Sequence, residues 1–134
     1  MRPNRVLIVE DDILLGWTIE RYLYDAGCRS VKVVTTVAEA MQTLRYSQPD
    51  VALLDLRLRG GELSLRVADA LDDIGAPFAF LTGHNQEMIS ERHRDRPFLK
   101  KPASPKEILE CLRSAVDIAH RDGPVATTPV PRRA

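Results

Sequence analysis

Short apolar runs alternate along the chain with longer stretches in which apolar residues recur every three or four positions. Runs of about four to eight apolar residues are typical of buried β-strands, and the wider spacing is typical of helices that pack one face on a core. The apolar runs are VLIV at 6–9, VKVV at 31–34, VALL at 51–54, FAFL at 78–81 and a weaker PFLK at 97–100. Strands that alternate with helices predict an α/β domain with five parallel strands.

Apolar stripes and capping residues locate the helices between these strands. A stripe over 13–26 predicts the first helix, and a stripe over 65–74 predicts the third. Capping boxes, which pair a hydroxyl with a glutamate three residues later, lie at 36–39 and at 104–107. They predict the starts of the second and the last helix.

Two segments lack a strong helical pattern. In the stretch 84–96 only Met88 and Ile89 are strongly apolar, so we expect a short or mobile helix there. The stretch 121–134 contains three prolines and little that a core could bury, which predicts a flexible C-terminal tail. We therefore expect one domain, over residues 1–120.

Polar residues that could take part in binding or catalysis directly follow four of the five predicted strands. In a flavodoxin-like, doubly wound sheet of order 2-1-3-4-5, with helices on both faces, these four strands are neighbours, and ligands bind beyond their carboxyl ends. We therefore expect the following side chains to face one crevice: Glu10, Asp11 and Asp12 after the first run, Asp55 after the third, Thr82 after the fourth and Lys101 after the fifth.

Carboxylates gathered in one crevice call for a cation, because two unit charges about 4 Å apart repel by roughly 4 kcal/mol at an effective dielectric of about 20. All-oxygen ligation favours magnesium, for which manganese can substitute, whereas zinc prefers histidine or thiolate ligands. An Asp-Asp pair alone would more simply begin a helix. The residues at the neighbouring strand ends favour a metal pocket instead, and we assign Asp12 mainly to capping.

This set of residues suits phosphoryl transfer. A carboxylate oxygen of Asp55 can attack a phosphoryl group while the metal and the Lys101 ammonium neutralise its oxygens. The resulting aspartyl phosphate would add about 1.5 to 2 negative charges, and the Thr82 hydroxyl could bond to one of the new oxygens.

The motifs VLIVEDD, LLDLRL, LTG and FLKKP, in this order over residues 4 to 119, resemble those of response-regulator receiver domains. The resemblance implies a domain that is phosphorylated by a histidine kinase and signals by switching conformation, or acts as a phosphate sink or shuttle. It implies these roles: Glu10 and Asp11 as metal-binding acids, Asp55 as phospho-acceptor, Arg57 as a metal ligand through its backbone carbonyl, Thr82 as the switch hydroxyl, Phe98 as the switch aromatic and Lys101 as the phosphate-binding lysine. It also implies a cis peptide before Pro102.

The stretches LRGGELSLRVADAL and PFAFLTGHN further resemble the single-domain receivers of the FATGUY group, with the motif reading Phe80-Leu81-Thr82-Gly83-His84-Asn85 here. Members of that group resemble intermediates in alphaproteobacterial stress signalling. The resemblance implies a sensor histidine kinase, of the HWE or a related class, or a phosphotransfer protein as the phosphoryl source. A further protein would act downstream.

Composition narrows the choice of partners. The chain has 19 basic and 19 acidic residues, so no excess of positive charge points to nucleic acid or to a membrane surface. No run approaches the roughly 20 apolar residues of a membrane span, and the start of the chain does not resemble a signal peptide, so we expect a cytoplasmic protein. Cys28 and Cys111 are expected to be buried, inert thiols.

Several other residues carry weaker signals. The histidines have no shared spacing and no local acid cluster, so we expect His84, His93 and His120 at solvated loop or helix positions. The glycines that follow Arg59 predict a loop that turns past the site rather than a phosphate-binding motif. Trp17 and Tyr22 on the first helix fit either core packing or a partner surface.

Two other functions compete with the phospho-receiver: an interaction module and an aspartate-based phosphohydrolase. A receiver fold without an output domain could regulate a partner by constitutive contact, independently of phosphorylation. An aspartate-based phosphohydrolase would need a second carboxylate two residues after its nucleophile, where this chain has Arg57. We therefore expect no enzymatic turnover beyond the domain's own phosphorylation and dephosphorylation.

Overall fold

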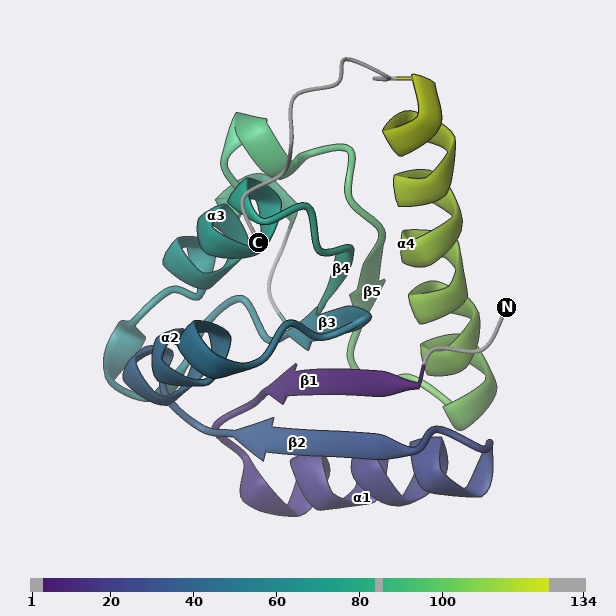
Figure 1. Ribbon diagram of the computed structural model, residues 1–134. Coiled ribbons are helices and arrows are strands. Elements are labelled where there is room, and N and C mark those ends of the chain that lie inside the picture. Colours follow the sequence, from purple (N-terminus) through teal and green to yellow (C-terminus); the bar gives the residue numbers. More distant parts are fainter. Residues whose placement is uncertain (1–3, 84–85, 126–134) are drawn as a thin grey trace.

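The computed structural model describes residues 4–83 and 86–125, which fold around a five-stranded parallel sheet (Figure 1). The strand order is β2-β1-β3-β4-β5, as predicted. The strands are β1 (Arg5–Val9), β2 (Ser30–Val34), β3 (Val51–Leu54), β4 (Phe78–Thr82) and β5 (Phe98–Lys100). The order reverses between β1 and β3, so the carboxyl ends of these two strands border the crevice in which such sheets bind ligands.

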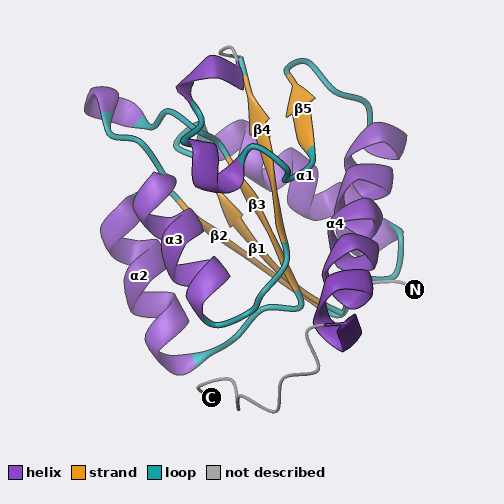
Figure 2. Ribbon diagram, turned by 90° about the horizontal axis from the view of Figure 1, so that it is seen from above, coloured by secondary structure: helices purple, strands orange, loops and turns teal. Residues whose placement is uncertain are grey.

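Helices cover both faces of the sheet, as Figure 2 shows. The helices are α1 (Ile13–Asp25), α2 (Val37–Tyr46), α3 (Leu65–Asp73) and α4 (Pro105–Val125). Because side chains alternate along a strand, Leu7 and Val9 of β1 join the core under α2 and α3, while Val6 and Ile8 join the core under α1 and α4. Both faces of β1, β3 and β4 are buried, which explains their continuous apolar runs.

The predicted capping residues hold the helix ends. The Asp12 carboxylate accepts a hydrogen bond from the Leu15 amide at 3.2 Å, in line with the capping role assigned to it. The Thr36 hydroxyl accepts a hydrogen bond from the Glu39 amide at 3.1 Å. The Glu39 carboxylate in turn accepts from the Thr35 amide, one residue earlier than in a reciprocal capping box. These bonds satisfy amides that the first turn of a helix leaves without intrahelical partners.

The last capping box is fully reciprocal. Ser104 donates its backbone N–H to Glu107 Oε1 at 2.8 Å, and the Glu107 amide donates to Ser104 Oγ at 3.1 Å. Helix α4 then continues through 121–125, so the first residues of the predicted tail are helical. The remainder of that segment, 126–134, lies outside the described residues.

The connection between β4 and β5 contains no α-helix within residues 86–96. It forms two single 3-10 turns, Gln86–Met88 and Glu91–His93, in agreement with the weak helical pattern. Ile89 is buried in the core under α2 and α3. The prediction for His93 was wrong, because its side chain is fully buried, whereas the side chains of the other two histidines lie outside the described residues.

The remaining expectations concern single residues. Cys28 is buried and Cys111 is half-buried in the core under α1 and α4, where burial raises the pKa of the Cys111 thiol to about 11. Trp17 is 55% exposed, which removes the core-packing alternative for its side chain. The Lys101–Pro102 peptide is cis. No helix in the described part of the chain has the length and apolar character to cross a membrane.

Candidate functional site

The candidate site lies where β1, β3, β4 and β5 end. Beyond the last residues of β1 and β3, ladder hydrogen bonds continue: the Asp55 amide donates to the Val9 carbonyl at 2.8 Å, and the Glu10 amide donates to the Val34 carbonyl at 3.0 Å. The backbones of Glu10 and Asp55 are therefore held as rigidly as the sheet itself. The sheet, and not a flexible loop, positions their carboxylates.

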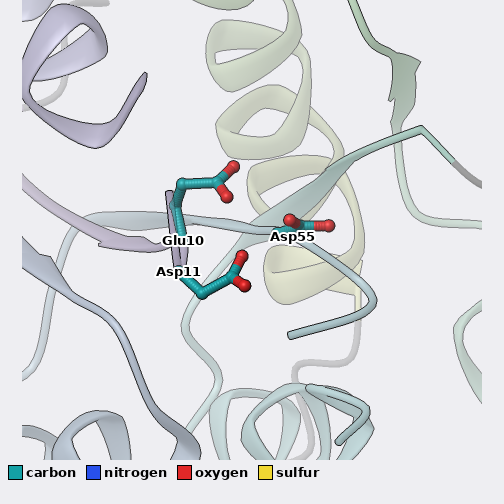
Figure 3. Close-up of side chains that lie close together, drawn as sticks. All are labelled: Glu10, Asp11 and Asp55. Carbon is teal, nitrogen blue, oxygen red and sulfur yellow. The ribbon is translucent and has the colours of Figure 1, made fainter. Parts of the chain in front are cut away.

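Three carboxylates converge at this edge, as Figure 3 shows. Glu10, Asp11 and Asp55 each present an oxygen within 4.8 Å of the other two. Glu10 is 2% exposed and Asp55 is 6% exposed, so water screens their charges poorly. Such a cluster needs positive charge nearby if all three groups are to be ionised.

The side chain of Lys101 supplies one such charge. Its Nζ donates a hydrogen bond to Asp55 Oδ2 at 3.1 Å and forms an ion pair with Glu10 Oε1 at 2.7 Å, so one ammonium contacts two buried acids. Burial opposes the charged form of Lys101, but the bonds to Glu10 and then to Asp55 outweigh it and raise the pKa of the ammonium. Lys101 is therefore charged at neutral pH.

The same burial acts on Glu10 in the opposite sense. It raises the pKa of Glu10 to about 7, although the hydrogen bonds from Lys101 and from the Asp12 amide favour the carboxylate. The negative charge of Asp55 adds to the increase. The single ammonium of Lys101 therefore does not offset the burial of Glu10 and its repulsion by Asp55.

The loop after β3 wraps around Asp55. The Arg57 amide donates to Asp55 Oδ1 at 3.3 Å, which places the Arg57 backbone beside the carboxylate, while the role of its carbonyl oxygen as a metal ligand stays a prediction. Gly60 and Gly61 both have φ of 81°, the left-handed conformation that turns the loop past the site as expected. Arg59, 83% exposed, brings its Nε only to 4.0 Å from Asp11.

Thr82 and Phe98 occupy the neighbouring strands. Thr82 is the last residue of β4 and is fully buried, and its carbonyl accepts a hydrogen bond from the Lys101 amide at 2.9 Å. Phe98 begins β5, pairs in register with Phe80, and packs half-buried against the core under α2 and α3. The backbone thus joins Thr82 to the lysine that contacts Asp55, whereas Phe98 contributes to the core.

The donor set fits a hard divalent cation. Three carboxylates offer only oxygen ligands, and the buried negative charge exceeds the single ammonium that contacts it. Magnesium takes one or two carboxylates and keeps several waters, which suits a cluster whose third acid, Asp11, remains partly exposed. Glu10, Asp11 and Asp55 are thus the side chains that would hold it.

The sequence predicted that the side chains of Glu10, Asp11, Asp55 and Lys101 meet at this edge, but not how they contact one another. It did not anticipate the ion pair between Lys101 and Glu10, because placement at strand ends says nothing about side-chain direction. It also missed the approach of Arg59 to Asp11, for which a basic residue in the loop was the only signal. A groove of about 690 Å³ between α2 and β2 is lined by none of the site residues.

Comparison with known proteins identifies relatives of the whole domain. Residues 6–113 match the family model of the response regulator receiver domain. The transcriptional regulatory protein PdtaR of Mycobacterium tuberculosis is 30% identical over 138 aligned positions, which cover 93% of this chain and 64% of PdtaR. The chain thus spans less than two thirds of that relative.

Solved structures agree. The solution structure of SdrG from Sphingomonas melonis is 36% identical, with a TM-score of 0.74 over 87% of this chain and 98% of SdrG. The BeF3-activated conformation of SdrG is 37% identical, with a TM-score of 0.71 over 84% of this chain and 96% of that one. A CheY-like receiver from Methanospirillum hungatei shares the fold, with a TM-score of 0.78 at 22% identity over 90% of this chain and 98% of that one.

Proposed function

This chain belongs to the response regulator receiver domain family, and we propose that it accepts a phosphoryl group from a histidine kinase onto Asp55 and signals through the resulting change at Thr82. The observation that carries the proposal is the buried contact of Lys101 with both Glu10 and Asp55 at the crevice edge of the sheet. That contact joins a candidate nucleophile, a charge-neutralising cation and a metal-binding acid in one site.

Each residue has a distinct part in the transfer. An oxygen of Asp55 attacks phosphorus in line, forming an acyl phosphate while the bond from phosphorus to the donor's histidine nitrogen breaks. Lys101 stays protonated, and its hydrogen bond to Asp55 is replaced by one to an oxygen of the transferred phosphoryl group. Magnesium, held by Glu10, Asp11, Asp55 and the Arg57 carbonyl, would supply the remaining charge neutralisation, and manganese could replace it.

After transfer, the site holds about 1.5 to 2 additional negative charges. The Thr82 hydroxyl can then bond to a phosphoryl oxygen, which changes the conformation of the residues that follow β4. Phe98 at the start of β5 would report this change by altering its packing. Apart from losing its own phosphoryl group by hydrolysis, the domain would turn over no substrate.

We also propose that the chain is a cytoplasmic, single-domain receiver of the FATGUY group. The 36% identity to SdrG, in an alignment that covers 98% of the solved SdrG chain, supports this proposal. The phosphoryl source would be an HWE-class or related sensor kinase, or a phosphotransfer protein. The phosphorylated domain would act on a downstream protein or serve as a phosphate sink or shuttle.

A specific observation favours a second candidate, an interaction module that works without phosphorylation. Leu14 and Trp17 on α1 are 68% and 55% exposed, and exposed apolar residues of this size are typical of surfaces that bind another protein. The two functions differ in their need for Asp55. An Asp55→Asn variant that still controls its partner would favour the second.

The test of the first function is direct phosphorylation. Incubation with acetyl phosphate and magnesium should add one phosphoryl group, detected by intact-protein mass spectrometry, and beryllofluoride should bind in its place. Asp55→Asn should show neither reaction. The control is Asp50→Asn, which makes the same substitution at an exposed aspartate directly before β3, at the end away from the site. Labelling of the Asp55→Asn variant at the wild-type rate would contradict the proposal.

A further inference from the structure

The connection between β4 and β5, residues 86–96, is here called the strap. It lies beside α3 (Figure 1). Its apolar attachment is small: Ile89 is buried, Met88 is half-buried, and no α-helix forms within the strap to present a continuous apolar face. Other interactions must therefore contribute to holding it in place.

Those interactions form a cluster of charged side chains, here called the clasp. Its members are Asp69, Asp72 and Asp73 on α3 together with Arg92, His93 and Arg96 on the strap. Arg92 contacts all three aspartates, at 3.4, 2.9 and 2.8 Å. Arg96 bonds to Asp72, and its guanidinium lies 4.4 Å from the centre of the Phe78 ring on β4.

His93 anchors the inner side of the clasp. Its ring is fully buried, with its centre 5.3 Å from the Phe78 ring and 6.5 Å from the Phe80 ring. Its Nε2 lies 2.7 Å from Asp69 Oδ1, whereas Nδ1 has no hydrogen-bond partner among the described residues. A buried polar atom without a partner disfavours the docked state, so His93 is held less firmly than an apolar side chain of its size would be.

The outer side of the clasp exchanges readily with water. Arg92 is 45% exposed and Asp73 is 59% exposed, so their ion pair is weak and sensitive to salt. A strap held by ion pairs, one incompletely bonded histidine and a single buried aliphatic side chain, Ile89, can detach at lower free-energy cost than the strands of the sheet. Local detachment of this kind is the property that a conformational switch requires.

The strap is also close in sequence to the switch residue. Three residues, 83–85, separate Thr82 at the end of β4 from the start of the strap. The rings that cover His93 belong to the strand that carries Thr82. The strand that carries Thr82 is therefore in direct contact with the inner residue of the clasp, and a shift of Thr82 can reach the clasp through the packing of this strand.

We propose that the clasp is a releasable latch: the strap, while docked on α3, opposes the movement of Thr82, and phosphoryl acceptance at Asp55 detaches it. This inference rests on the proposed function, because Asp55 must accept the group for the coupling to exist. By linkage, whatever loosens the clasp also strengthens binding of a phosphoryl mimic by the same factor.

Two clasp variants and one control test the latch. Arg92→Gln removes contacts from the strap, and Asp69→Asn removes them from α3. Arg113→Gln removes the same charge as Arg92→Gln from an exposed position on α4. Hydrogen exchange of the strap amides measures detachment, with the amides of β3 as internal reference. Fluorine NMR titration with beryllofluoride and magnesium measures affinity at Asp55.

Both clasp variants should exchange strap amides at least about fivefold faster and bind beryllofluoride about fivefold more tightly than the control. Beryllofluoride should also speed strap exchange in the wild-type protein. Wild-type protein that binds beryllofluoride with no change in the strap, or clasp variants that match the control in affinity, would overturn the latch alone. Wild-type protein that does not bind beryllofluoride would overturn the proposed function itself.

Discussion

The crevice at the strand ends and the clasp on α3 each contain three carboxylates, but they differ in burial and in the positive charge that faces them. In the crevice, Glu10 and Asp55 are almost wholly buried and share one ammonium. In the clasp, the three aspartates are 30% to 59% exposed and face two guanidiniums and an imidazole. The crevice thus has one cation for three acids, two of them buried, whereas the clasp has two guanidiniums for three acids that water reaches.

This difference separates a binding site from a structural contact. Exposed acids with matching cations gain little from further charge, because water already screens them. Buried carboxylates that face too little positive charge destabilise the fold, so binding of a divalent cation beside them lowers their free energy. Acidic residues alone therefore did not mark the site; their burial and their shortage of cations did.

The largest effect is expected from removing the ammonium of Lys101 from the crevice. Lys101→Met should slow labelling by acetyl phosphate roughly a hundredfold, because bonds to charged partners contribute about 1.5 to 3 kcal/mol. Mass spectrometry of the labelled protein gives the rate. Lys100→Met, which removes the same charge from the exposed neighbouring residue, should leave it unchanged, and equal rates for the two variants would show that the ammonium plays no part.

The second prediction concerns the pH dependence of stability, which the buried carboxyl of Glu10 should dominate. Folding raises the pKa of Glu10 from 4.5 to about 7, so between these values the folded protein holds a proton that the unfolded chain has lost. The free energy of unfolding should therefore fall as pH rises from about 5 to about 7, by roughly 2 kcal/mol relative to Glu10→Gln, and then level off. Urea titrations with EDTA measure this difference.

Magnesium should reduce this loss of stability with pH, since a bound cation favours the ionised carboxylate of Glu10. Urea titrations repeated with saturating magnesium should show a smaller loss of stability with pH in the wild-type protein. The Glu10→Gln variant, which has no proton to release, is the control. Parallel pH profiles for the two proteins without magnesium would mean that the burial of Glu10 does not perturb its ionisation.

The fold and the membership of the crevice were predictable because both follow from order along the chain. Apolar runs such as VALL are buried on both sides, which specifies parallel strands, and parallel strands deliver Glu10, Asp55 and Lys101 to one edge. These inferences need only the direction of the backbone. They do not depend on side-chain rotamers.

The clasp was not predictable in the same way. His93 lies in a polar stretch without apolar periodicity, and its burial depends on Asp69, 24 residues earlier, and on two phenylalanines of β4. Arg92 likewise finds its partners only when α3 is already packed on the sheet. Contacts between distant, individually unremarkable residues are a product of tertiary packing, and local pattern carries no record of them.

A third prediction concerns the clasp itself, where smaller effects are expected. Asp72→Asn weakens bonds to both Arg92 and Arg96 and should lower the free energy of unfolding by about 1 kcal/mol, because several charges here form one network. Asp25→Asn, which breaks a single exposed pair with Arg21, is the matched control and should cost less than about 0.5 kcal/mol. Urea denaturation at low and high salt measures both, and a loss that persists in high salt would refute an ionic clasp.

The smallest effect is expected at Arg59, an exposed cation at the edge of the crevice. Its Nε lies 4.0 Å from Asp11 and its side chain is 83% exposed, so the pair is comparable to an isolated surface ion pair. Arg59→Gln should change stability by less than about 0.5 kcal/mol and labelling by acetyl phosphate less than about twofold. If the labelling rate instead fell as far as in Lys101→Met, proximity to the acids would matter more than burial. The contrast drawn between crevice and clasp would then fail, because an exposed charge would have acted as strongly as a buried one.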